Sequence, residues 1–130
     1  MSDENTKVNP QLANAIQSGE FYRDYANNVF LESSEWDMKL IFGQLDQRTI
    51  PFRVEQHGSV SLPWNQAKVF AYLLCVHLAA YELQNGKITV PNSVLPPEPT
   101  PPKEGDPNLQ ALFQRMIWLR EQFFGEMAKP

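Results

Sequence analysis

The feature that most constrains this chain is the segment AKVFAYLLCVHLAAYEL, residues 67–83, because it is apolar on two opposite faces at helical spacing. A helix of this kind has to be covered on several sides. The segment is too short and carries too many polar groups to cross a membrane, which takes about 20 apolar residues. We therefore predict a buried helix that opens at Ser61-Leu62-Pro63-Trp64, with Pro63 in its first turn, and ends at Asn85-Gly86.

Upstream of this helix the apolar period changes to two, which is typical of strands. Val29 and Leu31 mark a first strand, and residues 36–43 alternate most clearly. A weaker third strand is expected near residues 52–60, where the partly polar pattern indicates an edge or a solvated face. Before the strands, Asn9-Pro10 and Gly19 could bound a short helix.

Downstream of the helix, seven of the eleven prolines lie within residues 89–107. We expect this segment to be an extended linker with polyproline II character that lets the last helix dock at a distance. Asp106-Pro107 then sets up a cap for that last helix, in which apolar residues recur at spacings of three and four.

These patterns predict an α+β fold, with a three-stranded or four-stranded antiparallel sheet packed on one long helix. The expected parts are an N-terminal tail with a short helix (1–20), a β-β-β-α module (21–88), the proline-rich linker (89–107) and an amphipathic C-terminal helix (108–130).

Charge and cysteine content exclude several classes of function. The 11 basic and 15 acidic residues are dispersed, so no basic stripe for nucleic acid or an anionic membrane is visible. The single cysteine cannot form an internal disulfide, which is compatible with a reducing cytoplasm. The N-terminus lacks the apolar core of a signal peptide. We expect a cytoplasmic protein with no nucleic-acid or membrane partner.

No local motif of a catalytic, metal or phosphate site is present in the sequence, so we expect no cofactor and no metal. His57 could act as a base with Asp37 or Asp46, but a solvent-facing role is the better prediction. His77 is expected in the core or in a subunit interface, and Cys75 is expected to be a buried, inert thiol. Tyr25, Asn27, Asn28 and Asp37 are interpreted as structural polar groups, with no catalytic residue among them.

Several short motifs in their order resemble a small prokaryotic family, domain of unknown function 3467. They are Tyr25-Ala26-Asn27-Asn28, Trp36-Asp37 with Leu40, Phe42 and Gly43, a Ser/Pro helix start, Ala67-Lys68, and Tyr81-Glu82 before Gly86 and Ile88. The resemblance covers about residues 22–90, and Leu62 departs from it by separating Ser61 from Pro63. It implies a strand-strand-strand-helix module and no catalytic residues.

We predict a non-catalytic protein-interaction module that associates with itself as a homodimer or larger oligomer. A helix apolar on two faces and an aromatic final helix exceed what a small sheet can cover. The expected interface residues are Val69, Phe70, Leu73, Val76, His77, Leu112, Phe113, Met116, Ile117, Phe123 and Phe124. Two alternatives stay open. One is a chaperone that binds unfolded or partner polypeptides, by topological likeness to SecB-like export chaperones, and the other is a small enzyme using Asp37 and His57.

Overall fold

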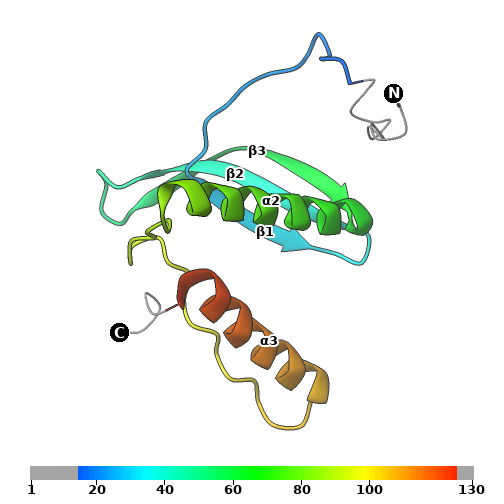
Figure 1. Ribbon diagram of the computed structural model, residues 1–130, viewed down its shortest axis with the longest axis vertical. Coiled ribbons are helices and arrows are strands. Elements are labelled where there is room, and N and C mark those ends of the chain that lie inside the picture. The colour runs from blue at the N-terminus through cyan, green and yellow to red at the C-terminus, as the bar shows by residue number, and fades with distance from the viewer. Residues whose placement is uncertain (1–14, 126–130) are drawn as a thin grey trace. The chain divides into compact units, whose positions relative to one another are not determined.

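The computed structural model describes residues 15–125 and has an α+β fold (Figure 1). Three strands, β1 (Asn28–Ser33), β2 (Asp37–Asp46) and β3 (Arg53–Pro63), form an antiparallel sheet in the order β1-β2-β3. Two helices follow, α2 (Trp64–Asn85) and α3 (Pro107–Phe124). The predicted fold class is confirmed, with three strands in the described part of the chain. The chain divides into two compact units, up to Tyr72 and from Leu73 onward.

The alternation of β2 gives the sheet one apolar face. Leu40 lies opposite Leu31 of β1 and Val60 of β3, so the three side chains share that face. Lys39, opposite Glu32 and Ser61, lies on the other face. This pattern is typical of an antiparallel sheet that is covered on one side only.

The third strand differs most from its prediction. It is the longest of the three strands and runs to Pro63, so α2 begins at Trp64 and Pro63 is not in the helix. The strand contains a β-bulge: Phe42 pairs with Gly58 but Gly43 pairs with Gln56, which leaves His57 as the extra residue. Val54, Val60 and Leu62 keep one period of two in the sequence, but the bulge places Val54, opposite Leu45, on the other face of the sheet from Val60 and Leu62, which lie opposite Leu40 and Met38.

Gly43 is required at this bulge because the main chain of β3 packs closely against it. A Cβ atom on Gly43 would lie 2.6 Å from the carbonyl oxygen of Glu55 and 3.1 Å from the Cα of Gln56. These neighbours are main-chain atoms of β3, which cannot turn aside as a side chain can. The glycine therefore allows β2 and β3 to approach where their register shifts.

Local capping fixes the ends of both helices. Trp64 donates its indole N–H to the carbonyl oxygen of Ser34 at 2.9 Å, which ties the first turn of α2 to the end of β1. Gly86 follows α2 with φ of 88°, as predicted for a glycine that ends a helix. Asp106 accepts from the amides of Asn108 and Leu109 before α3, which confirms the predicted cap. The helix expected between Asn9 and Gly19 lies mostly outside the described residues, and residues 15–18 are not helical.

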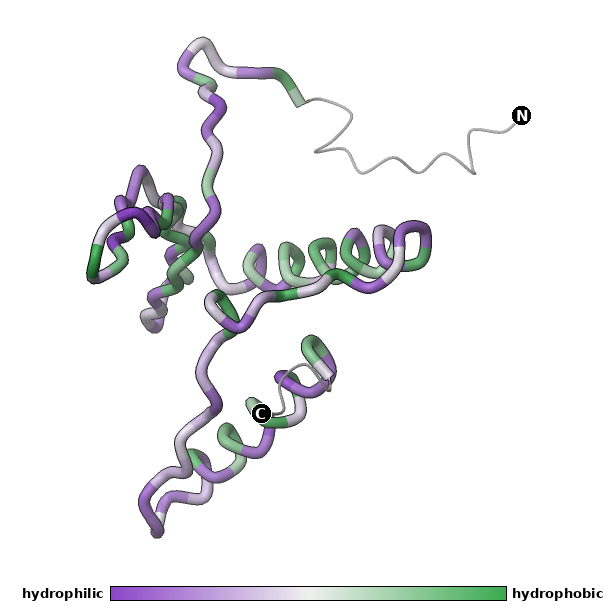
Figure 2. The backbone as a smooth tube through the Cα atoms, turned by 90° about the vertical axis from the view of Figure 1, so that its left-hand side faces the viewer, coloured by the Kyte–Doolittle hydropathy of each residue, from purple (hydrophilic) through white to green (hydrophobic). Residues whose placement is uncertain are grey.

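Very little apolar surface is buried within the described residues. Leu40, at 8% exposure, is the only buried large hydrophobic residue between positions 15 and 125, and neither α2 nor α3 contains a buried residue. Figure 2 shows hydrophobic residues along the length of α2 and recurring through α3. The helix predicted to be buried is instead largely exposed.

Candidate functional site

One exposed row of apolar side chains runs along α2, and we call it the α2 stripe. Its members step through the helix by four, three, four and three residues, which places them on one side of an α-helix. They are Val69, Leu73, Val76, Ala80 and Leu83. All five are exposed, from 45% for Val76 to 89% for Leu83 among the four larger ones. No member is charged or polar, so none of these side chains can form a hydrogen bond with water.

A second exposed row runs along α3, and we call it the α3 stripe. Its steps are three, four, three and four, the reverse of the order in α2. The members are Leu109, Leu112, Met116, Leu119 and Phe123. Their exposed fractions lie between 39% for Leu119 and 54% for Leu112. Both helices thus present a row of the kind that lines helix–helix contacts in coiled coils.

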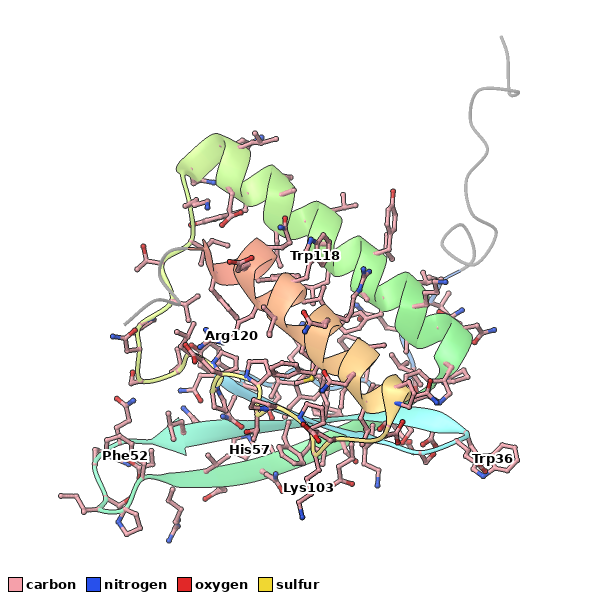
Figure 3. The ribbon with its side chains drawn as sticks, turned by 90° about the horizontal axis from the view of Figure 1, so that it is seen from below. Trp36, Phe52, His57, Lys103, Trp118 and Arg120 are labelled. Atoms are coloured by element: carbon pink, nitrogen blue, oxygen red, sulfur yellow. The ribbon has the colours of Figure 1, made fainter. Side chains whose placement is uncertain are left out.

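A different side of α3 is already covered by the proline-rich segment, which runs back beside the helix within the second unit. The guanidinium of Arg120 donates to the carbonyl oxygen of Pro96 at 2.7 Å (Figure 3). Pro99 and Pro101 line a groove of about 430 Å³ together with Phe113 and Ile117. At 100° per residue, this covered side lies about 90° around the helix from the α3 stripe. The segment predicted to be a linker holding α3 at a distance therefore contacts α3 itself.

The interface residues predicted from sequence divide between these surfaces. Val69, Leu73 and Val76 belong to the α2 stripe, and Leu112, Met116 and Phe123 belong to the α3 stripe. The remaining five lie elsewhere. Phe113 and Ile117 line the proline groove, Phe124 lines a second cavity with Cys75, Phe70 is 41% exposed, and His77 lines an open groove with Tyr81 and Lys87.

The prediction that Cys75 is buried is wrong, because this thiol is exposed. It lines a cavity of about 360 Å³ with Ala79 and Glu82 of α2 and with Gln122 to Phe124 at the end of α3. The sequence argument assumed that an apolar helix is a buried one. In this structure α2 has no buried residue, so its central cysteine is accessible as well.

His57, at the bulge of β3, has carboxylate neighbours other than those considered from the sequence. Its Nδ1 lies 3.1 Å from Oδ2 of Asp24, and its Nε2 lies 3.6 Å from Oε1 of Glu55. The imidazole is 26% exposed and Glu55 is 71% exposed, so the cluster is at the surface. These contacts hold the segment before β1 against β3.

Asp24 and Glu55 were missed by the sequence analysis for different reasons. Asp24 lies 33 residues before His57, and no periodicity connects the two positions. Glu55 is two residues before His57 in the same strand, and side chains at that spacing share a face. That spacing was the one signal that could have identified a partner.

Asp37 and Asp46 each make a local turn contact and neither reaches His57. Asp37 accepts from the hydroxyl of Ser34 at 3.0 Å in the turn between β1 and β2, and it pairs with Pro63 at the end of the sheet. Asp46 accepts from the side chain of Arg48 at 3.0 Å, and this hydrogen bond holds the pKa of the Asp46 carboxyl below its ordinary value. The bulge lies five to six residues from Asp37 along β2, about 18 Å, so Asp37 and His57 do not converge.

Of the polar residues predicted at the start of the sheet, Asn27 makes the contact that joins two separate segments. Asn27 accepts from the amide of Leu45 at 2.6 Å through its side chain, which links the chain before β1 to β2. Asn28 pairs with Gly43 as the first residue of β1. Tyr25 is 71% exposed and donates its backbone N–H to Asp24. Asn27 and Asn28 thus contact the sheet, whereas this contact of Tyr25 is with its own neighbour in the chain.

Between residues 15 and 125, no three His, Cys, Asp or Glu side chains are arranged to hold a metal ion. No helix in that range is long and apolar enough to span a membrane. Comparisons with protein-family models, with curated proteins and with solved structures found no match. The resemblance to domain of unknown function 3467 therefore stays a prediction, and the two apolar stripes are the candidate functional surfaces.

Proposed function

We propose that this chain is a non-catalytic protein-interaction module that works as a homo-oligomer assembled through α2 and α3. The observation that carries the proposal is the shortage of core. Leu40 is the one buried large hydrophobic residue among the described positions, while both helices expose an uncharged apolar stripe.

The energetic argument compares this exposure with the stability of a small domain. Covering a large apolar side chain is worth about 1.5–3 kcal/mol. The nine large side chains of the two stripes are each more than one-third exposed, and covering half of that surface would add about as much as the 5–15 kcal/mol that stabilises a whole domain. Association is a direct way to gain this free energy, since it couples folding to the burial of the stripes.

A second copy of the chain is the partner that this surface fits best. The stripes carry no charged residue, so a partner needs no complementary charge. Both stripes have the spacing of helix–helix contacts. Two-fold association is the commonest arrangement of soluble homo-oligomers, and it covers the same surface on both copies.

The proposal is tested by Val76→Asp in the middle of the α2 stripe, with Lys68→Asp as its control, an exposed polar position about 100° around the same helix from the stripe. Val76 exposes roughly 80 Å² at its 45% exposure, which corresponds to about 2 kcal/mol of burial per copy. A symmetric dimer loses this twice, so we expect its dissociation constant to rise about a thousandfold. Valine and aspartate have similar helix propensities, so the substitution by itself should leave the helix content unchanged.

Sedimentation velocity over a range of concentrations measures the effect. We expect Lys68→Asp to associate as the unaltered chain does and Val76→Asp to dissociate. Equal association of both variants would contradict the proposal. Strong binding of a hydrophobic dye by the native oligomer would instead favour a chaperone, because its apolar grooves would then stay open after assembly.

A further inference from the structure

We infer that the α2 stripe of one copy pairs antiparallel with the α3 stripe of a second copy, so that the last helix of each chain packs against α2 of the other. This inference rests on the proposed self-association and adds its partner surface, direction and register.

The first argument is the match of the two patterns. Read toward the C-terminus, the α2 stripe steps by four, three, four and three, and the α3 stripe read in the opposite direction has the same steps. Antiparallel helices therefore bring all five positions into layers without an offset. The layers are Val69 with Phe123, Leu73 with Leu119, Val76 with Met116, Ala80 with Leu112, and Leu83 with Leu109. Each layer joins the two heptad positions that face one another in antiparallel coiled coils.

The second argument is size complementarity within the layers. The larger α3 side chains Leu112, Met116 and Phe123 stand opposite the smaller Ala80, Val76 and Val69. Pairing large with small residues keeps the two helix axes at an even distance, as close packing requires. A homotypic pair of α2 helices lacks this compensation, because Ala80 and the two valines would face one another or leucine.

The third argument is the surface area that the pairing would bury. From the exposed fractions, the two stripes together would bury about 1,000 Å² per helix pair. A two-fold dimer contains two such pairs and would bury about 2,000 Å², which lies at the boundary between standard and obligate interfaces. One pair alone would fall below the size of a stable specific interface.

The fourth argument concerns which copy supplies α3. Within the second unit, the end of a chain's own α3 lies beside Cys75, Ala79 and Glu82 of α2. This side is about 110° around α2 from the α2 stripe. Phe123 borders that cavity yet remains 53% exposed. The chain's own α3 thus leaves the α2 stripe open, and the α3 of a second copy can cover it.

Disulfide trapping tests the pairing, in chains whose native thiol is removed by Cys75→Ala. The pair Val76→Cys and Met116→Cys places two cysteines in the central layer. The pair Ala80→Cys and Leu112→Cys does the same in the next layer, should the first variant fold poorly. A disulfide needs Cα atoms within about 7 Å. Val76→Cys with Leu109→Cys is the mismatched control, displaced by seven residues or about 10 Å along α3. We expect at least about tenfold more covalent dimer from each matched pair than from the control.

Every other result overturns the inference in a recognisable way. An internal disulfide in a monomeric chain would mean that α3 covers the stripe of its own copy. A covalent dimer from Val76→Cys alone, with none gained by adding Met116→Cys, would mean that two α2 helices pair. Sedimentation of the Cys75→Ala chain separates the two proposals. A monomer would refute self-association itself, whereas an oligomer without the matched disulfides would refute only this pairing.

Discussion

The substitution Gly43→Ala tests the account of the bulge between β2 and β3. An added methyl group would stand 2.6 Å from the carbonyl oxygen of Glu55, well inside the 3.0 Å that real Cβ contacts keep. Since the neighbour is main chain, the two strands have to separate by several tenths of an ångström where their register shifts. Overpacking of this kind costs about 1–3 kcal/mol. That is a large part of the stability of a small domain.

Gly19→Ala is the matched control, because a methyl group at Gly19 meets nothing within 4 Å and the position has no positive φ. Urea unfolding followed by circular dichroism, at one protein concentration for both variants, gives the comparison. We expect Gly43→Ala to unfold at clearly lower urea and Gly19→Ala to stay within about 0.5 kcal/mol of the unaltered chain. Equal midpoints for the two variants would refute the close approach of β2 and β3 at Gly43.

Two further predictions concern local contacts. Because the hydrogen bond from Arg48 lowers the pKa of Asp46, the ionised carboxyl stabilises the fold above its ordinary value of 3.8, and the contribution is lost as the pH falls through the lowered value. In an NMR titration we expect a midpoint below 3.8 for Asp46 and a return toward 3.8 in Arg48→Ala, and an unchanged midpoint would contradict this. Asp106→Ala removes the cap of α3 and should cost about 1 kcal/mol, whereas Asp106→Asn should cost less, as measured by thermal unfolding. Equal losses from both would argue against the cap.

The elements that the sequence predicted well are those whose residues follow one period without interruption. In β2, Met38, Leu40 and Phe42 recur at every second position, and the strand forms where that pattern indicates. The end of α2 at Gly86 and the start of α3 at Asp106 depend on backbone chemistry that one or two residues determine. Patterns among neighbouring residues were therefore sufficient to predict this strand and these two helix boundaries.

The features that were missed depend on contacts between distant residues. Apolar residues are sparse in β3, so the strand looked weak and its end at Pro63 was assigned to the helix, and nothing in the sequence marked the bulge at His57. The contact of Asp24 with His57 spans 33 residues, and that of Arg120 with Pro96 spans 24. Nothing periodic marks these pairs. The spacing of the two stripes was visible in the sequence, but whether another part of the chain covers them depends on the fold.

Trp36 shows for a single residue that a sequence pattern does not determine whether a side chain is covered. A tryptophan beside a regular strand suggests core, yet it lies in the turn between β1 and β2 and is 80% exposed (Figure 3). Its backbone amide donates to the hydroxyl of Ser34, which fixes the turn and leaves the ring outside the sheet. Turn geometry, and not hydrophobicity, decides where this side chain points.

The central claim is that the apolar surface of α2 and α3 is covered by a second copy of the chain. Sedimentation equilibrium of the unaltered protein at micromolar concentration tests it most directly, because the mass is obtained without any assumption about shape. One chain has a mass of 14.9 kDa. We predict twice this mass or a larger multiple of it, and a single species of 14.9 kDa at that concentration would contradict the account.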